Sequence, residues 1–599
     1  MPDRYSAIED HAVIGDLHTV ALVAVDATID WCCLPRFDSP SVFGALLDAD
    51  RGGSFSVRSP CERTKQLYIP ESNVLVTRFL GNDSVGEVID FMVPYDGNIT
   101  TSSWPHRLVR RLRAVRGTVE FDIRCAPAFN FAQAPHTVHA IDNGGVVFKA
   151  PGAEMVLRST CSLSIDGPAA VARVRLECGE GVDLVLEWGG GFRSMVDGEA
   201  ETLFERTLSY WQNWLRRSRY EGRYREMVER SALVLKLLVY QPTGALVAAP
   251  TTSLPELIGG GRNWDYRYTW IRDAAFTLYG LMRLGFMDEA ASFMSWLEAR
   301  CHEAPEGEGL QVLYDIDGNP NIPETTLDHL EGYRGSGPVR VGNAAADQLQ
   351  IDIYGELMDS VYLFNKHGNP IAYDLWLALS RQLEWLEKNW DQPDDGIWET
   401  RGGRQQFTYS SVMTWVAFER AIRIASHRGL PAPIVRWRDC ANDAYQAVQR
   451  NSWNASRLAY VQYPGSSALD ASLLIMPLVK FAGPSDPRFL STLDRISEEL
   501  VNDSLVHRYE TDGSDGLVGG EGTFNLCSFW YVEGLTRAGR ITESRYVFEK
   551  MLTYANHVGL FAEQIGSAGE ALGNFPQAFT HLALISAAVN LDRAITRAG

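Results

Sequence analysis

Short runs of alternating apolar and polar residues dominate the first 190 or so residues of this sequence. We expect strands where the period is two, because successive side chains of a strand point to opposite faces. Turn signals such as Gly81-Asn82-Asp83 and Asp166-Gly167-Pro168 separate the runs. So many short strands with so little helix predict a large antiparallel β-sandwich. The predicted strands are Val20–Val25, Ile29–Leu34, Ser54–Val57, Val74–Phe79, Glu87–Val93, Leu108–Val115, Val119–Arg124, Val146–Ala150, Met155–Ser159, Ala170–Leu176 and Asp183–Glu187.

The pattern changes to a helical one after residue 195. Leu203, Leu208, Trp211 and Leu215 recur at helical spacing between Gly198 and Arg217. We therefore expect three parts: a β-sandwich domain over residues 1–195, a linker helix over 196–221, and a helical domain over 222–599.

The helical domain divides into twelve apolar-periodic segments, which we take as helices. Their ends are uncertain by about 2–4 residues, as is usual for boundaries inferred from a sequence. The segments are 223–239, 271–285, 287–300, 344–366, 370–390, 408–428, 436–450, 468–479, 487–500, 523–538, 541–556 and 576–594.

Two alternations along these helices predict how they pack. Odd-numbered helices such as Tyr373–Trp390 are amphipathic, whereas even-numbered ones such as Leu469–Val479 and Ala578–Val589 are apolar on nearly every side. The links after even helices are short and those after odd helices are long. An inner ring of six even helices inside an outer ring of six odd ones satisfies both alternations, although the count holds only if 287–300 is the third helix. This architecture is an (α/α)6 barrel of six helical hairpins.

Every long connection of such a barrel emerges at the same end, where a ligand site would form. We therefore expect five loops to surround one opening. They are Trp264–Asp273, Tyr333–Asn343, Asp394–Arg404, Arg508–Glu521 and Glu563–Pro576.

Composition and charge narrow the class of partner. The 599 residues carry a formal net charge of −20 and no basic block, which argues against nucleic acid and anionic membranes as partners. No apolar run approaches the ~18 residues of a membrane span, and the start of the chain lacks the pattern of a signal peptide. The nine cysteines are scattered without CxxC spacing, so we expect reduced thiols, no metal site and a cytoplasmic location. The sequence leaves open whether the chain forms a homo-oligomer.

The stretch Arg262–Asp273, RNWDYRYTWIRD, concentrates aromatic, guanidinium and carboxylate groups in twelve residues. Aromatic faces pack on the C–H faces of a sugar, and charged groups hydrogen-bond its hydroxyls. The stretch is therefore typical of a carbohydrate site. A crowded loop that caps the next helix is the alternative interpretation.

Two glutamates lie on the expected loops in similar settings. Glu399 follows Trp398 in DDGIWETRGG, and Glu563 follows Phe561 in GLFAEQI. Glycosidic cleavage needs such a pair, with one protonated acid for the leaving oxygen and one ionised base for water. Partial burial beside a ring would raise one pKa and keep that group protonated. For a single glutamate, a helix-start carboxylate favoured by the helix dipole would be the better interpretation.

The segment Trp31–Phe43, WCCLPRFDSPSVF, does not resemble the regular strands around it. It is either a connecting loop or a loop that leans on the pocket of the other domain. We predict the second, with the segment narrowing the opening and favouring a disaccharide over a polymer.

Four motifs together give the chain a family resemblance. RNWDYRYTWIRD, DDGIWETRGG, EGTFNLCSFWYVEGL and GLFAEQIG are similar to motifs of the family 15 glycoside hydrolases, which include glucoamylases, glucodextranases and trehalases. The likeness extends from IGDLHTVALVAVDATIDWCCLPRFDSPSVF near the start to the last helix. It implies a β-sandwich followed by a six-hairpin barrel, and cleavage of α-glucosides with inversion.

The resemblance also implies roles for individual residues. Glu399 resembles the general acid and Glu563 the general base of the family. Fungal glucoamylases have Glu-Glu where this chain has Glu399-Thr400, which puts its preference at the leaving-sugar subsite in doubt. The residues expected to contact the substrate are Tyr266, Tyr268, Trp270, Arg272, Asp273, Trp398 and Arg508.

The start of the chain, with TTSLPE and PVRVGNAA, most resembles the bacterial trehalase-like branch of the family. We expect an exo-acting hydrolase of a small α-glucoside, with trehalose favoured over malto- or isomalto-oligosaccharides and with no cofactor. A phosphate or Mg²⁺ requirement occurs among trehalases of this family, but no residue here indicates one. An inverting phosphorylase and a non-catalytic sugar-binding protein are the alternatives. Glu563 argues against the first, because a second carboxylate would repel phosphate.

Overall fold

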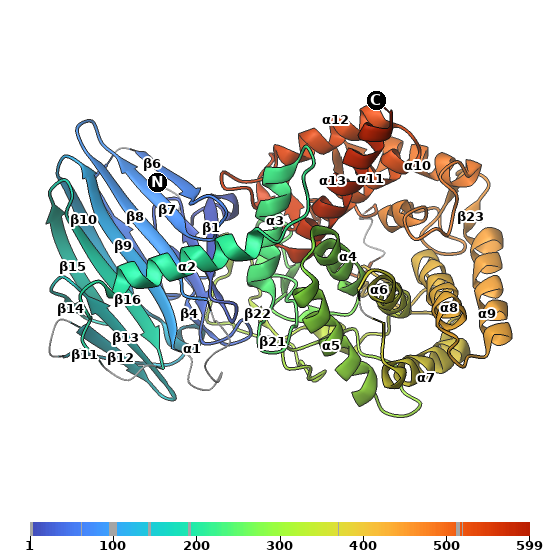
Figure 1. Cartoon of the computed structure of the whole chain (residues 1–599), viewed down its shortest axis with the longest axis horizontal. Coiled ribbons are helices and arrows are strands. Elements are labelled where there is room, and N and C mark those ends of the chain that lie inside the picture. The colour runs from blue at the N-terminus through green and yellow to red at the C-terminus, as the bar shows by residue number, and fades with distance from the viewer. Residues whose placement is uncertain are drawn as a thin grey trace.

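The computed structural model describes residues 4–61, 63–94, 105–141, 145–189, 193–368, 370–510, 515–517 and 519–598. A domain of β-strands lies on one side of the molecule and a domain of helices on the other (Figure 1). The helix α2 (Glu199–Leu215) runs along the strand domain toward the helical one. A sheet-rich domain followed by a helical domain is what the hydrophobic pattern predicts.

The strand domain consists of two antiparallel sheets of eight strands each. In the first sheet the order is β1-β2-β3-β5-β10-β15-β14, with β4 paired to β3, and in the second it is β11-β12-β13-β16-β9-β8-β7-β6. Strand β10 shows the alternation that buries one face, since Phe121 and Ile123 are buried while Asp122 between them is exposed. The two sheets enclose a shared apolar core.

The strand bounds follow the sequence pattern closely. Each predicted strand overlaps an observed one: β2 (Val20–Ala24), β3 (Ile29–Cys33), β5 (Ser54–Arg58), β7 (Leu75–Leu80), β8 (Val85–Met92), β9 (His106–Arg116), β10 (Val119–Ala126), β12 (Gly145–Ala150), β13 (Ala153–Ser159), β15 (Ala169–Leu176) and β16 (Gly181–Trp188). Five further strands were not predicted: β1 (His11–Gly15), β4 (Ser41–Phe43), β6 (Arg63–Tyr68), β11 (Thr137–Ile141) and β14 (Ser164–Asp166). All five residues of β1 are buried, so this strand lacks the alternation that marks a half-buried one.

The helical domain contains a closed ring of contacting elements. Helix α4 contacts α6, α6 contacts α8, α8 contacts the 3₁₀ helix η6, η6 contacts α11, α11 contacts α13, and α13 contacts α4. The remaining helices lie outside this ring (Figure 1). The bounds are α3 (Arg225–Leu238), α4 (Ala274–Leu284), α5 (Met287–Glu303), α6 (Ile353–His367), α7 (Tyr373–Asn389), α8 (Thr408–Arg428), α9 (Ile434–Ala447), η6 (Ala471–Ile475), α10 (Pro487–Glu499), α11 (Asn525–Arg537), α12 (Ile541–Leu552) and α13 (Ala578–Ala598).

Two of the helices differ from the prediction. The expected helix 468–479 is a five-residue 3₁₀ helix, Ala471–Ile475, followed by turns. Pro477 explains the difference, because its ring lacks an N–H and clashes with the preceding turn of an α-helix. The expected helix 344–366 begins only at Ile353.

The delayed start of α6 also has an identifiable cause. The backbone N–H groups of Leu349 and Ile351 donate to the carboxylates of Asp395 and Asp394, each over 2.8 Å. These side-chain bonds replace the hydrogen bonds that a helix would make there. They attach the segment before α6 to the loop that carries Glu399.

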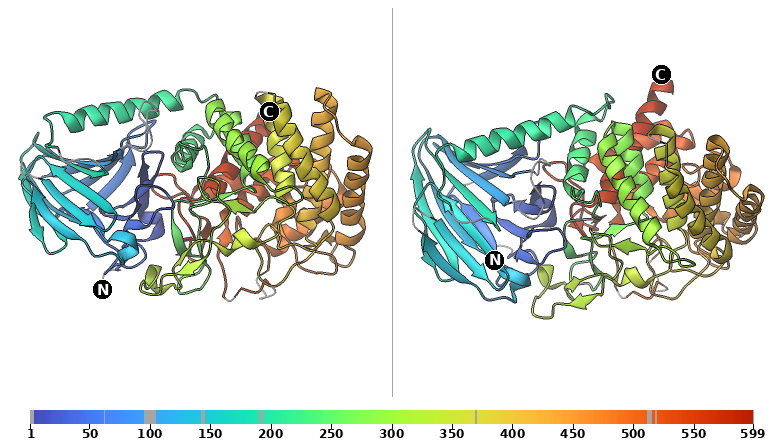
Figure 2. Two further views of the ribbon diagram at one scale, coloured as in Figure 1. Left: turned by 90° about the horizontal axis from the view of Figure 1, so that it is seen from below. Right: turned by 60° about the horizontal axis from the view of Figure 1, so that its bottom comes forward.

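The long connections of the helical domain gather at one end of its helices. Figure 2 shows them below the helices, at the end opposite the C-terminus. Three short strands at this end join distant parts of the chain, because β27 (Thr523–Phe524) pairs with β28 (Gln564–Ile565), which pairs with β29 (Ala571–Leu572). Among the helices of the described residues, none is both long and apolar enough to cross a membrane.

Candidate active site

A pocket lies at the loop end of the helical domain, and seven of the residues singled out in the sequence line it. They come from three of the five loops expected around one opening. The seven residues are Tyr266, Trp270, Arg272, Asp273, Trp398, Glu399 and Arg508.

Glu399 is held in the pocket by two donors from the neighbouring loop. Its Oε1 atom accepts hydrogen bonds from Trp270 Nε1 over 2.7 Å and from Arg272 Nη1 over 2.9 Å. A carboxylate that accepts from an indole N–H and a guanidinium has a fixed position. Its side chain remains 21% exposed, so a ligand in the pocket can reach it.

The backbone at Glu399 adopts an unusual conformation. Its φ is +58°, in the left-handed region that non-glycine residues rarely occupy. Such backbone costs of order 1–3 kcal/mol and concentrates at functional sites. The neighbouring Trp398 is fixed as well, because its Nε1 donates to Asp470 Oδ1 over 2.9 Å.

Arg272 also forms an ion pair with the adjacent Asp273, at 3.2 Å between Nε and Oδ1. Burial raises the pKa of Asp273 to about 6, against the lowering effect of the Arg272 guanidinium. The pair thus provides both a hydrogen-bond donor and an acceptor at one wall of the pocket, as recognition of sugar hydroxyls requires.

Glu563 does not itself line the pocket, but it is hydrogen-bonded to a residue that does. Tyr266 OH donates to its Oε1 atom over 2.6 Å, and the backbone N–H of Asn574 donates to Oε2 over 3.2 Å. The residue is only 1% exposed. Burial raises the pKa of Glu563 to about 8, and the neighbouring Glu256 carboxylate adds to the rise. Without a substrate, Glu563 therefore favours the protonated form at neutral pH.

Arg508 belongs to a buried network of charges beside the pocket. Its guanidinium contacts Glu521 through Nε at 2.9 Å and Glu256 through Nη2 at 2.9 Å. Arg262 contacts the same Glu521 at 3.0 Å and Asp515 at 2.8 Å. Because each buried charge has partners of opposite sign, the network holds Arg508 rigidly.

Tyr268 is not among the residues that line the pocket. It lies in a small buried cluster with Ala248, Trp270 and Val312. Its position does not support the substrate contact expected of it. The sequence could not show this, because the irregular backbone between Tyr266 and Trp270 gives no period from which to infer the direction of the side chain.

The segment Trp31–Phe43 leans on the helical domain, as predicted, but none of its residues lines the pocket, so its narrowing of the opening stays a prediction. It packs against the chain that leads into the pocket. Trp31 Nε1 donates to the carbonyl oxygen of Pro250 over 2.8 Å, and Arg267 Nη1 donates to that of Ser39 over 2.7 Å. Arg267 belongs to the aromatic loop and is fully buried. The segment therefore helps to fix that loop through its contact with Arg267.

Several lining residues were not among the site residues inferred from the sequence. Eight of them lie in the quoted motifs: Glu256 in TTSLPE, Trp264 in RNWDYRYTWIRD, Asn343 and Ala345 in PVRVGNAA, Ile397 and Arg401 in DDGIWETRGG, and Phe524 and Leu526 in EGTFNLCSFWYVEGL. The other five lie outside these motifs. The additional residues are Ala248, Glu256, Trp264, Asn343, Ala345, Gln348, Ile397, Arg401, Leu517, Phe524, Leu526, Gln577 and Phe579.

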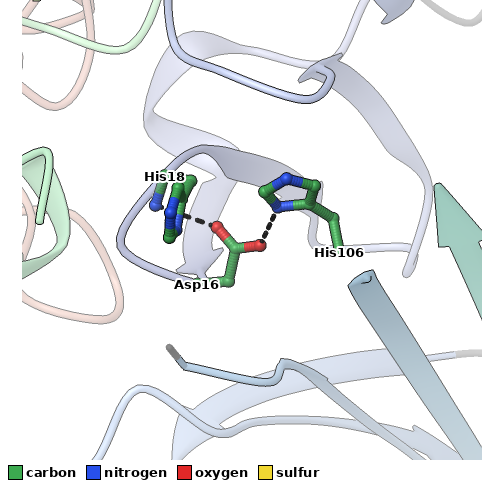
Figure 3. Close-up of side chains that lie close together, drawn as sticks. All are labelled: Asp16, His18 and His106. Atoms are coloured by element: carbon green, nitrogen blue, oxygen red, sulfur yellow. Dashed lines mark hydrogen bonds and ion pairs between the residues drawn. The ribbon is translucent and has the colours of Figure 1, made fainter. Parts of the chain in front are cut away.

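A second cluster of titratable groups lies in the sandwich domain. Ligand-type atoms of Asp16, His18 and His106 lie within 4.8 Å of one another, all buried (Figure 3). Asp16 Oδ2 contacts His106 Nδ1 at 2.6 Å, and its Oδ1 accepts from the backbone N–H groups of His18 and Thr19. Burial alone would raise the pKa of Asp16, but the His106 ring lowers it below its ordinary value. These bonds fix the turn between β1 and β2, and we assign the cluster a structural role.

The fold and the pocket define a class of protein: a two-domain glycoside hydrolase with paired glutamates at a pocket of aromatic and charged side chains. The model of the glycosyl hydrolases family 15 matches residues 222–589, and that of the trehalase-like N-terminal domain matches residues 2–211. The chain belongs to glycosyl hydrolases family 15.

Curated relatives resemble the chain over nearly its whole length. A trehalase of Mycolicibacterium smegmatis is 40% identical over 98% of this chain and 92% of its own. A trehalase of Thermoplasma acidophilum is 39% identical over 96% of this chain and 99% of its own. A bacterial glucoamylase solved in complex with acarbose aligns with a TM-score of 0.72 at 12% identity, over 98% of this chain and 95% of that one. This last likeness shows that the two chains share a fold.

Proposed function

We propose that this enzyme hydrolyses α,α-trehalose to two molecules of glucose, with inversion at the attacked anomeric carbon. One observation carries the proposal: Arg272 and Trp270 both donate hydrogen bonds to Glu399 in the pocket. Glu563 is hydrogen-bonded to Tyr266 of the same pocket. Trehalases that are about 40% identical over nearly the whole chain support trehalose as the substrate.

The proposal includes the architecture that presents this site. We propose that the helical domain is an (α/α)6 barrel, with the sandwich over residues 1–195, the linker over 196–221 and the barrel over 222–599. The closed ring of contacts from α4 to α13 supports the barrel, as does the fold shared with a glucoamylase. The charged side chains of the pocket are paired with one another, which supports a small neutral α-glucoside as the substrate.

In the proposed reaction, the α-glucosidic C–O bond breaks while a water oxygen bonds to the anomeric carbon from the opposite side. The motifs assign Glu399 as the acid that protonates the leaving oxygen and Glu563 as the base that takes a proton from water. The separation of their carboxyl groups should be about 6.5–9.5 Å, the spacing of inverting glycosidases. Arg272, Asp273 and Arg508 would bind hydroxyls of the glucose that is attacked.

The electrostatics of the site make these two roles worth testing separately. A pKa of about 8 for Glu563 favours the protonated form, whereas a base must be ionised. The base role therefore requires that substrate binding or alkaline pH remove this proton. The reverse assignment, with Glu563 as the acid and Glu399 as the base, is the alternative to be tested.

The first experiment identifies the substrate and the product. The enzyme is incubated with trehalose, isomaltose, maltose, dextran and starch, each with and without phosphate. We expect glucose from trehalose above all, with β-glucose formed first in proton NMR. Preferred release of glucose from the other glucosides would support the oligosaccharide alternative. Glucose 1-phosphate would identify a phosphorylase, and first-formed α-glucose would contradict inversion.

The second part of this test separates the acid from the base. Glu399→Gln and Glu563→Gln should each lower the rate by about 10²–10⁴-fold, the usual contribution of general acid or base catalysis. A substrate with a better leaving group needs less protonation, so it should partly rescue the variant that lacks the acid. Rescue of Glu399→Gln supports the proposed roles, and rescue of Glu563→Gln instead would reverse them. The exposed Glu306→Gln should retain full activity.

A further inference from the structure

The residue after Glu399 does not face the pocket. The hydroxyl of Thr400 donates to the carbonyl oxygen of Asp395 over 3.1 Å, and the residue is 6% exposed. Thr400 therefore cannot hold a sugar in the way that the resemblance implies for a glutamate at this position. Arg401, one residue further on, lines the pocket.

Arg401 lies on an aromatic ring that also lines the pocket. Its guanidinium carbon is 4.3 Å from the centre of the Trp264 ring, and that of Arg340 is 4.6 Å from the same centre. Trp264 is itself fixed, because its Nε1 donates to Glu256 Oε1 over 3.2 Å. Guanidinium groups over an indole ring are attracted by its electron-rich faces.

A single carboxylate joins the two guanidiniums. Glu324 contacts Arg340 through Oε1 and Arg401 through Oε2, each at 3.3 Å. The backbone N–H of Arg401 donates to the carbonyl oxygen of Asp515 over 2.7 Å, which fixes the chain at this point. The side chain of Arg401 nevertheless remains 35% exposed, so its other N–H donors can reach a ligand.

The place of Arg401 decides which part of the substrate it can meet. It is two residues from Glu399, on the same loop and in the same pocket, whereas Arg272, Asp273 and Arg508 belong to other segments. Under the proposed function, Glu399 meets the oxygen that joins the two sugars. The second sugar continues from this oxygen, away from the groups that bind the first.

We propose that Arg401 binds the leaving glucose by donating hydrogen bonds to its hydroxyls, with Trp264 and Glu324 as positioning residues. The inference rests on the proposed function, because it takes the substrate to be a disaccharide of glucose. Arg401 supplies the donors, and the Trp264 ring that it covers holds its guanidinium in place.

Two substrates test this inference. Trehalose fills the leaving-sugar site, whereas α-glucosyl fluoride leaves it empty because fluoride is the leaving group. Loss of a hydrogen bond from a charged donor should lower kcat/KM for trehalose by about 10- to 100-fold in Arg401→Ala. The same variant should hydrolyse α-glucosyl fluoride within about 3-fold of the wild type, because no contact to the first sugar is lost.

Two further variants control for folding and for charge. Arg404 lies on the same loop, pairs with Asp395 at 3.1 Å and does not line the pocket, so Arg404→Ala should behave as the wild type with both substrates. Glu324→Gln keeps the shape but loosens Arg401, and should show a smaller loss with trehalose alone. Equal losses with both substrates, or no loss with trehalose in Arg401→Ala, would overturn the inference.

Failure of the proposed function would look different. In that case the wild type itself would release glucose from α-glucosyl fluoride but not from trehalose. The comparison of Arg401→Ala with Arg404→Ala would then be made on the disaccharide that the wild type does hydrolyse, with the same outcomes for and against.

Discussion

At the scale of single residues, Glu563 shows how burial sets the chemistry of this site. The carboxyl group is enclosed on all sides, hydrogen-bonded to Tyr266 and close to the buried Glu256. A low-dielectric environment disfavours the charged form, and a second carboxylate disfavours it further. Ionising this group in the folded protein therefore costs free energy. The free energy of unfolding should show that cost.

The stability should depend on pH through Glu563. Its pKa is about 8 in the folded protein and about 4.3 in an unfolded chain. Between these values the folded state binds the extra proton, so this group makes the fold less stable as the pH rises toward 8. Glu563→Gln stays neutral and avoids the loss. We expect the variant to equal the wild type near pH 4–5 and to exceed it by more than about 1.4 kcal/mol at pH 8, the equivalent of one pKa unit.

Chemical denaturation of both proteins at several pH values from 5 to 8 measures this difference. The exposed Glu306→Gln provides the control, with a difference from wild type that does not change over the same range. A Glu563→Gln variant that is uniformly less stable at every pH would contradict the raised pKa.

At the scale of elements, the inner helices α6 and α8 pack closely against each other. Helices α6 and α8 are in contact, and at Gly355 the backbone of α8 comes close to that of α6. A Cβ atom added there would lie 2.3 Å from the carbonyl oxygen of Met413. Backbone cannot move aside as a flexible side chain can, so the two helices would have to separate.

We therefore expect Gly355→Ala to destabilise the protein by about 1–3 kcal/mol, as overpacking typically does. The matched control is Gly280→Ala in α4, where the added Cβ would lie 3.2 Å from the end of the Leu582 side chain. Alanine is favoured over glycine in a helix by about 1 kcal/mol, so this control should be neutral or slightly stabilising. Denaturant unfolding followed by circular dichroism compares the two. Equal effects would contradict the close helix contact.

At the scale of the whole molecule, the two domains share apolar packing and hydrogen bonds. One continuous cluster of buried side chains includes Trp31 and Phe37 of the sandwich domain as well as Leu237 of α3. Arg230 of α3 donates to Asn73 Oδ1 over 2.6 Å, and Asn556 donates to the carbonyl oxygen of His11 over 2.7 Å. An interface of this kind couples the unfolding of the two domains.

We expect the full chain to unfold in a single calorimetric transition despite its two domains, because neither can expose the shared cluster without losing stability. Trp31→Ala removes a buried ring and its bond to Pro250, and should lower the transition temperature. The exposed Leu377→Ala on α7 serves as the control with little change. Two separate transitions in the wild-type chain would contradict this coupling.

Much of this organisation could be predicted from the sequence because its signals are local. The period of two marks β10, and the all-round apolar faces of α11 and α13 identify them as inner helices. Hydrophobic periodicity records which face of an element is buried, so it is readable before the chain folds. The grouping of the long loops at one end follows from the same alternation of helices.

The tertiary structure decided what depends on neighbours that are distant in the sequence. The raised pKa of Glu563 requires Glu256, more than 300 positions earlier. The burial of Tyr268 and the place of Arg401 in the pocket lining depend on irregular backbone, for which no period exists. The segment at 31–43 packs against Pro250 and Arg267, which lie more than 200 positions away in the sequence, and does not itself line the pocket. Local pattern thus identified the residues of the site, while their directions and charges came from the folded environment.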